Sequence, residues 1–286
     1  DESGQTLSFN ITGNSNVALF SVGPVIDSDG NLTYTPSPNA NGTATITLVI
    51  MDNGGGTDTS PSQSFMINVT AVNDPPVIPA DSDDVANIVP EGATSGTTVG
   101  ITAFSTDVDA PAVSYLLTDS AGGRFTIDSV TGVVTVADST LLNFETATSH
   151  TITVEASDGA GGTTTATFTI LVTNVAPTTP TDANPAANSV AEGTANGTLV
   201  GITAASTDLN GPAVSYLLTD NAGGRFAIDS ATGEVSVADS TLLNYETNTS
   251  HTITVEASDG ATGTSTATFT ILVTNVTPTT PTDANG

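Results

Sequence analysis

Acidic side chains are the residues of this 286-residue chain whose number and spacing could do chemistry. The stretch LLNFETATSHTITVEASDGAGG at 141–162 returns as LLNYETNTSHTITVEASDGATG at 242–263, so Glu145 recurs as Glu246 after 101 residues. Thirty acidic residues against two arginines give a formal charge of −28. Such a chain repels itself unless its carboxylates lie far apart in salt or gather around bound cations. The second possibility would be metal-ion chemistry.

The composition excludes several other classes of function. Nucleic acids and anionic membranes are bound through clusters of Lys and Arg, so neither is expected as a partner. The chain has no cysteine, which rules out disulfides and thiolate metal sites. It also contains no lysine for Schiff-base chemistry. No apolar run of about 18 residues is present, so no membrane insertion is expected.

Catalytic groups are scarce. His150 and His251 are one repeated position without a neighbouring Ser or Cys nucleophile, and we expect a structural histidine with satisfied nitrogens. Arg124 and Arg225 are likewise one position, expected to pair with a local acid or to cover the core with their stems. The sequence therefore predicts no enzyme.

The elements that must position the acids are short strands. A fixed step of 101 residues is too long for a solenoid turn and fits one small domain per repeat. In ATFTILVTNV, Phe168, Ile170 and Val172 share one face, which is the alternation of a strand over a core. Strands of this kind between Asp-Gly and Gly-Gly turns predict an all-β chain of tandem Ig-like, antiparallel Greek-key β-sandwiches.

Proline-bearing segments at 71–79, 172–180 and 273–281 predict stiff connectors, because Pro fixes the backbone and removes a ladder donor. The predicted domains are 1–75, an N-terminally incomplete Ig/cadherin-like sandwich; 76–176 and 177–277, two full repeats; and 278–286, the start of a further repeat or a linker.

Three stretches of each repeat carry a family resemblance. RFTIDSVTGVVTVAD (124–138), LLNFE (141–145) and TITVEASDGAGG (151–162) resemble the signature of cadherin repeats. LTYTPSPNANGTATITLVIMDNGG (32–55) and VNDPP (72–76) resemble Ig-like and cadherin-like modules of very large bacterial surface and secreted proteins. The resemblance implies a linear rod of cadherin-like sandwiches.

Cadherin repeats bind calcium (Ca²⁺) at the joints between domains, and the resemblance places ligands in this chain. At the joint between the second and third units they are Glu91, Glu145, Asn174, Asp208, Asn210 and Asp259; at the first joint, Asn73, Asp74, Asp107, Asp109 and Asp158; and at the open end, Glu192, Glu246 and Asn275. Such oxygens suit Ca²⁺, which takes six to eight of them, better than Mg²⁺.

Departures from the cadherin pattern lower the expected affinity. Asn143 and Asn244 stand where cadherins have Asp, and the linker VTNVAP lacks the two aspartates of that family. We therefore expect one or two ions per joint, bound in the range of about 10⁻⁴ to 10⁻³ M. The competing interpretation is that the carboxylates only form turns and keep the chain soluble, as we expect of Asp119, Asp128 and Asp138.

These observations predict a calcium-stiffened structural segment of a large bacterial adhesin or surface fibre, extracellular and either secreted or on the cell surface. Its expected partners are neighbouring repeats, copies of itself, other cells or surface glycans. The alternative is a carbohydrate-binding accessory module of a secreted polysaccharide-degrading enzyme, although the chain has no Trp and four Tyr. A weaker possibility is that a neighbouring chain donates a missing strand to the first unit.

Overall fold

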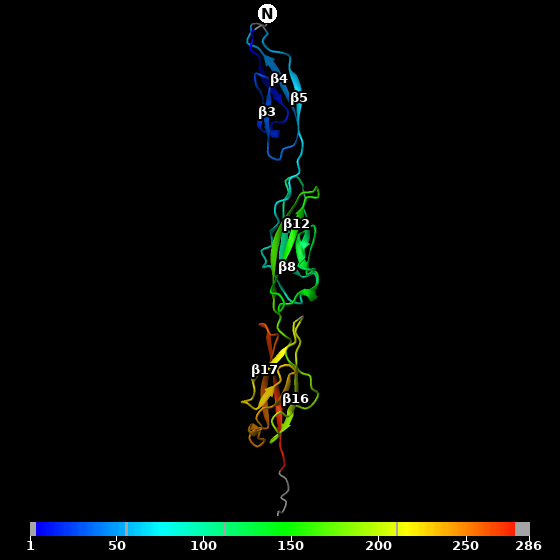
Figure 1. Cartoon of the computed structure of the whole chain (residues 1–286), viewed down its shortest axis with the longest axis vertical. Helices are drawn as coiled ribbons and strands as arrows, with labels where there is room; N and C mark the ends of the chain where they lie inside the picture. Colours follow the sequence, from blue (N-terminus) through cyan, green and yellow to red (C-terminus); the bar gives the residue numbers. More distant parts are fainter. Residues whose placement is uncertain (1–3, 55–56, 111, 210, 278–286) are drawn as a thin grey trace, which may run out of the picture. The chain divides into compact units, whose positions relative to one another are not determined.

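The computed structural model describes residues 4–54, 57–110, 112–209 and 211–277. It is 47% strand and 3% helix, and Figure 1 draws it almost entirely as strands and loops, so the all-β prediction is confirmed. The segment 278–286, predicted to open a further repeat, lies outside the described residues. Internal contacts divide the chain into two compact units: residues 1–78 with loops 105–114 and 156–164, and the remainder.

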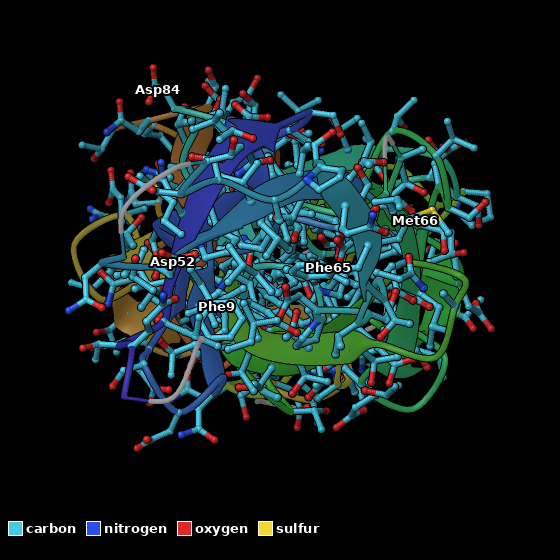
Figure 2. The ribbon with its side chains drawn as sticks, turned by 90° about the horizontal axis from the view of Figure 1, so that it is seen from above. Phe9, Asp52, Phe65, Met66 and Asp84 are labelled. Carbon is cyan, nitrogen blue, oxygen red and sulfur yellow. The ribbon has the colours of Figure 1, made fainter. Side chains whose placement is uncertain are left out.

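The first sandwich has two sheets and a small core. One sheet has the order β1-β4-β5 and the other pairs β2 with β3. The strands are β1 (Ser8–Asn14), β2 (Phe20–Ile26), β3 (Leu32–Pro36), β4 (Gly42–Met51) and β5 (Gln63–Val69), with a short 3-10 helix η1 (Val17–Leu19). Phe65 packs against the core while Met66, the next residue, is 73% exposed (Figure 2). This is the period of two expected for a strand with one buried face.

The second sandwich consists of two four-stranded sheets, ordered β10-β11-β8-β6 and β7-β13-β12-β9. Figure 1 labels one strand of each sheet, β8 of the first and β12 of the second. Its elements are β6 (Ala80–Asp81), β7 (Ile88–Pro90), β8 (Thr98–Phe104), β9 (Ser114–Asp119), β10 (Phe125–Ile127), β11 (Val133–Val136), η2 (Ser139–Leu141), β12 (Ser149–Ser157) and β13 (Thr163–Thr173).

The third sandwich repeats this plan 101 residues later, with sheets β14-β16-β19-β18 and β15-β21-β20-β17. Its elements are β14 (Thr181–Asp182), β15 (Ser189–Ala191), β16 (Leu199–Ala205), β17 (Ser215–Asp220), β18 (Phe226–Ile228), β19 (Glu234–Val237), η3 (Ser240–Leu242), β20 (Ser250–Ser258) and β21 (Thr264–Thr274). Ile253 and Val255 of one sheet pack in one cluster with Val200 and Ile202 of the other. Each such side chain contributes about 1.5–3 kcal/mol by leaving water.

One strand pairing differs from the expected antiparallel pattern. β7 runs parallel to β13, with Val89 opposite Val172, and β15 runs parallel to β21 in the same way. The reason is that the first strand of each repeat is split: β6 joins β8 in one sheet, and the chain then crosses to the other sheet. Its second piece therefore runs alongside the last strand in the same direction.

Glycine at position 100 is required by a close approach of two backbone segments. Gly100 has φ +76°, and a Cβ there would lie 2.3 Å from the carbonyl oxygen of Ala86. Gly201 repeats this contact with Ala187 at 2.3 Å. The segment that crosses between the sheets can therefore pack closely on β8 and β16 only where no side chain intervenes.

The acids expected to form turns do so. Asp128 Oδ1 accepts the N–H groups of Val130 and Thr131, and Asp138 Oδ1 accepts the N–H of Thr140 at the start of η2. These hydrogen bonds lower the pKa of both carboxyl groups, for Asp128 chiefly through the N–H of Thr131 and for Asp138 chiefly through the Thr140 hydroxyl. Both side chains are therefore engaged in local turns.

Candidate functional site

The second joint comprises the linker 174–178 after β13 and the acidic loops around it. Glu91, directly after β7, is 1% exposed. Its Oε2 accepts the N–H of Phe144 at 3.0 Å, and its Oε1 accepts the N–H of Val175 at 2.8 Å. The carboxylate thereby ties the linker to the loop that carries Glu145, and each of its oxygens retains a lone pair.

Asp259, after β20, reaches the same linker from the third sandwich. It is 1% exposed, and its Oδ1 accepts the N–H groups of Ala261 at 2.7 Å and Gly263 at 3.2 Å. Its Oδ2 accepts Nδ2 of Asn174 at 2.9 Å. A Cβ at position 263 would lie 2.0 Å from that Oδ2, so only glycine leaves room for the bond. The hydrogen bond to Asp259 therefore holds the Asn174 side-chain amide through Nδ2 and does not use its Oδ1.

Several oxygens at the second joint are buried without a donor. Both carboxylate oxygens of Glu145, both of Asp208 and Oδ1 of Asn174 have no hydrogen-bond partner and almost no contact with solvent. Buried polar atoms are normally hydrogen-bonded, and a buried carboxylate without a partner is strongly unfavourable. An arrangement of this kind favours a positive charge at the joint.

The carboxylates of the second joint also raise one another's proton affinity. Burial raises the pKa of Glu145, its own N–H partly offsets this, and the charges of Glu91, Asp208 and Asp259 raise it further. Burial likewise raises the pKa of Asp208, and the nearby N–H of Leu209 offsets part of this rise. The negative charges of Glu91 and Asp259 raise the pKa of Asp208 further. The sequence-predicted acids of this joint therefore lie within range of each other's charge.

Carboxylates do not complete the site by themselves. In the described part of the chain, no group of three or more His, Asp or Glu side chains is arranged to hold a metal ion. Amide and backbone oxygens must contribute, and Oδ1 of Asn174 is one that is buried and unpartnered. Asn210, the other amide predicted for this joint, lies outside the described residues. The donor set is oxygen only and anionic, which is the chemistry that hard divalent cations prefer.

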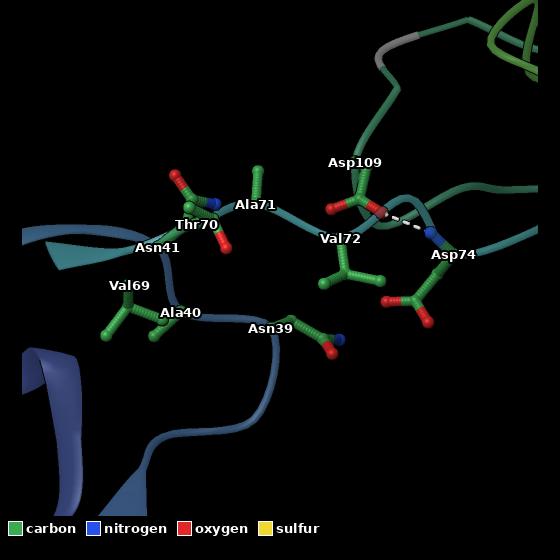
Figure 3. Close-up of a pocket in the computed structure, with 9 residues that line it drawn as sticks. All are labelled: Asn39, Ala40, Asn41, Val69, Thr70, Ala71, Val72, Asp74 and Asp109. Atoms are coloured by element: carbon green, nitrogen blue, oxygen red, sulfur yellow. Dashed lines mark hydrogen bonds between the residues drawn. The ribbon is translucent and has the colours of Figure 1, made fainter.

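The first joint comprises the linker 70–78 with loops 105–114 and 156–164. Nδ2 of Asn73 donates to Oδ2 of Asp158 at 2.6 Å, and the N–H of Asp74 donates to Oδ2 of Asp109 at 2.7 Å (Figure 3). Asp107 Oδ1 accepts the N–H of Asp109 at 2.7 Å, whereas its Oδ2 is buried without a partner. The structure thus places the five predicted residues in two hydrogen-bonded groups, Asn73 with Asp158 and Asp74 with Asp109 and Asp107.

The end of the third sandwich holds the last predicted group. Glu192 accepts the N–H of Tyr245 and of Val276, each at 3.0 Å, and the bond from Val276 is the main cause of its lowered pKa. Glu246 and Asn275 are exposed. Glu192 therefore repeats the clamp of Glu91, while the other two residues are open to solvent.

The repeated histidine differs from expectation, and the repeated arginine bonds backbone carbonyls. Nε2 of His150 is buried with no hydrogen-bond partner, as is Nε2 of His251, so the prediction of satisfied nitrogens is wrong. The His150 ring lies against the ring of Phe125, with the two centroids 6.2 Å apart. Arg124 donates Nε to the carbonyl of Leu141 at 2.9 Å rather than to an acid. The sequence carries no signal for these contacts, because the partners are backbone atoms and ring faces.

The two histidines predict a pH dependence. Burial, and then the charge of Arg124, holds the pKa of His150 below 6.5, and His251 is lowered in the same way. The folded state then binds fewer protons than the unfolded state, so stability is complete above about pH 6.5 and is lost as pH falls toward the folded pKa. When the pH is lowered from about 7.5 to 5.5, the melting temperature of a His150→Gln/His251→Gln variant should fall less than that of the parent chain. Parallel curves for the two proteins would contradict the assignment, because the carboxylates are common to both.

Comparison with known proteins identifies the repeats. The model of the cadherin domain matches residues 87–173 and 187–274, which is more than half of the chain. The chain belongs to the cadherin family. The model of a bacterial Ig domain matches residues 1–63 of this cadherin chain, so the resemblances in both parts are confirmed. The domain boundaries at 75, 176 and 277 stay predictions.

Individual proteins and solved structures are also similar to this chain. Human Protocadherin Fat 1 is 32% identical over 206 residues, covering 68% of this chain but only 4% of that protein's length. The crystal structure of human CDH23 EC21-23 shares the fold with a TM-score of 0.51 at 23% identity, covering 93% of this chain and 88% of that one. That of mouse Cadherin-23 EC22-24 gives 0.45 at 22% identity, covering 95% and 87%.

Cadherin repeats are typical of extracellular structural and adhesive segments, and the similar structures are themselves tandem cadherin repeats. Within the residues that the structure describes, no helix is long and apolar enough to cross a membrane.

Proposed function

We propose that this chain is a calcium-stiffened structural segment of a large bacterial extracellular adhesin or surface fibre, without catalysis. The observation that carries the proposal is the set of buried, unpartnered oxygens of Glu145, Asp208 and Asn174 between two cadherin repeats. The N–H groups of Glu145 and Leu209 offset only part of the cost of burying the two carboxylates, and their negative charges repel each other. A cation is the ligand that removes both penalties.

The residues divide into ligands and supports. Glu145, Asp208 and Oδ1 of Asn174 would bind the ion directly, since their lone pairs are free. Glu91 and Asp259 hold the linker through backbone and amide donors and still have lone pairs to offer. Bound calcium supplies two positive charges and accepts six to eight oxygens. With their charges neutralised, the carboxylates no longer separate the two repeats, so the joint keeps one orientation and the chain becomes a stiff rod.

The setting on a bacterial surface rests on the family matches. The bacterial Ig domain matched by residues 1–63 precedes cadherin repeats, which are extracellular in relatives. The 4% coverage of Protocadherin Fat 1 fits a segment of a much larger protein. Partners would be neighbouring repeats of the same chain, copies of it, other cells or surface glycans.

Thermal unfolding of the chain in chelator and across a calcium titration tests the proposal, with magnesium as the ion control. At calcium of about 100 times Kd, the expected gain is about 2.7 kcal/mol. Glu145→Gln should melt higher than the parent chain in chelator, because a buried charge is removed, and gain less from calcium.

Glu246→Gln, the same change at the exposed equivalent position, should leave the calcium response intact and serves as the matched control. If calcium changed the melting temperature of neither the parent chain nor any variant, the proposed function would be refuted.

A further inference from the structure

The two joints of this chain differ in how their carboxylates are satisfied, although equivalent positions recur 101 residues apart. Asp107 and Asp208 are equivalent, as are Asp74 and Val175. At the first joint Asp107 Oδ1 accepts loop N–H groups, and only its Oδ2 lacks a donor. At the second joint both oxygens of Asp208 lack a donor among the residues that the structure describes.

The backbone N–H of the linker that follows the last strand of each sandwich is also used differently at the two joints. The N–H of Asp74 donates to Asp109 on the loop that follows β8, so a protein hydrogen bond reaches from the linker to the next sandwich. The N–H of Val175 instead turns back to Glu91 of its own sandwich. The second joint therefore keeps the amide–carboxylate bond from Asn174 to Asp259, while its linker N–H is bonded within the second sandwich. The residue equivalent to Asp109 is Asn210, which lies outside the described residues.

Solvent access separates the joints further. Asn73 and Asp109 are exposed, and Asn39, Asn41 and Asp74 line an open hollow of about 240 Å³ beside them (Figure 3). Water can reach the carboxylates there and offset their charge. At the second joint Glu91 and Asp259 are each 1% exposed. The first sandwich, a bacterial Ig domain, also contributes no buried glutamate like Glu91 to the first joint among the described residues.

We infer that the calcium dependence of this chain is concentrated at the second joint, whereas the first joint is closed mainly by its own hydrogen bonds and binds the ion weakly. This inference rests on the proposed function and specifies which joint responds to calcium. At intermediate calcium concentrations the second and third sandwiches are fixed to one another first, and the contacts at the first joint change little. The two joints thus respond to calcium in two separate concentration ranges, the second joint at the lower one.

Hydrogen–deuterium exchange of the whole chain tests the inference, with the amides of Asp74 and Val175 as equivalent reporters of the two joints. When calcium is raised to about ten times the Kd of the second joint, exchange at Val175 should slow about tenfold and exchange at Asp74 less than about twofold. Asp208→Asn should abolish the slowing at Val175. Asp107→Asn, the matched change at the first joint, should leave it intact.

The outcomes separate the two proposals. Equal slowing at both amides, or slowing at Asp74 alone, would overturn the inference while leaving the proposed function standing. No calcium effect at either amide would overturn both. Far-ultraviolet circular dichroism confirms that each near-isosteric variant is folded, so loss of slowing cannot be attributed to unfolding.

Discussion

Replacement of Glu91 by alanine is expected to lower the free energy of unfolding by about 3 to 5 kcal/mol in chelator, because two charge-assisted hydrogen bonds of about 1.5–3 kcal/mol each disappear. The N–H groups of Phe144 and Val175 lose their acceptor in a place where the side chain they bonded was 1% exposed. The linker then detaches from the loop that bears Glu145. Urea unfolding of the chain, followed by exchange of peptides from each repeat, measures the effect.

Glu192→Ala is the matched control for this prediction. Glu192 makes the same two bonds, to Tyr245 and Val276, but its side chain is only partly buried. Water can replace the lost acceptor there, so the expected loss of stability is clearly smaller than that of Glu91→Ala. Equal losses for the two variants would show that burial does not set the strength of this clamp. A loss confined to Glu192→Ala would reverse the assignment.

Gly100→Ala should destabilise the second sandwich by about 2–5 kcal/mol, the sum of a left-handed backbone of about 1–2 kcal/mol and overpacking of about 1–3 kcal/mol. The new Cβ would lie 2.3 Å from the carbonyl oxygen of Ala86, so one of the two backbone segments must move. Thermal unfolding of the chain, with the second repeat followed by hydrogen exchange, reports the loss.

Gly123→Ala separates the two causes, since Gly123 has φ +88° with no atom within 4 Å of the added Cβ. It should cost about 1–2 kcal/mol, the conformational part alone. Gly201→Ala should repeat the large effect in the third sandwich, where the Cβ would meet Ala187 at the same distance. If Gly100→Ala and Gly123→Ala were equally destabilising, the close approach would not be what requires glycine.

The conformation of the repeats followed from local patterns. Alternation of Phe168, Ile170 and Val172 needs only neighbours in the chain to be recognised, and it predicted both the strand and its buried face. The turn-forming acids were predictable for the same reason, because Asp128 bonds residues two and three positions away. The split first strand was not, since its parallel pairing joins Val89 to Val172.

The sequence by itself determined the all-β class, the 101-residue repetition, and which acids recur at the ends of strands. It could not distinguish Glu91 from Glu145, since both are single glutamates at positions that resemble calcium ligands. Tertiary structure decided that the Glu91 carboxylate accepts hydrogen bonds from backbone N–H groups 53 and 84 residues away. It also decided that the carboxylate oxygens of Glu145 are buried without a hydrogen-bond partner. The physical reason is that desolvation and hydrogen bonding depend on which distant segments pack around a carboxylate.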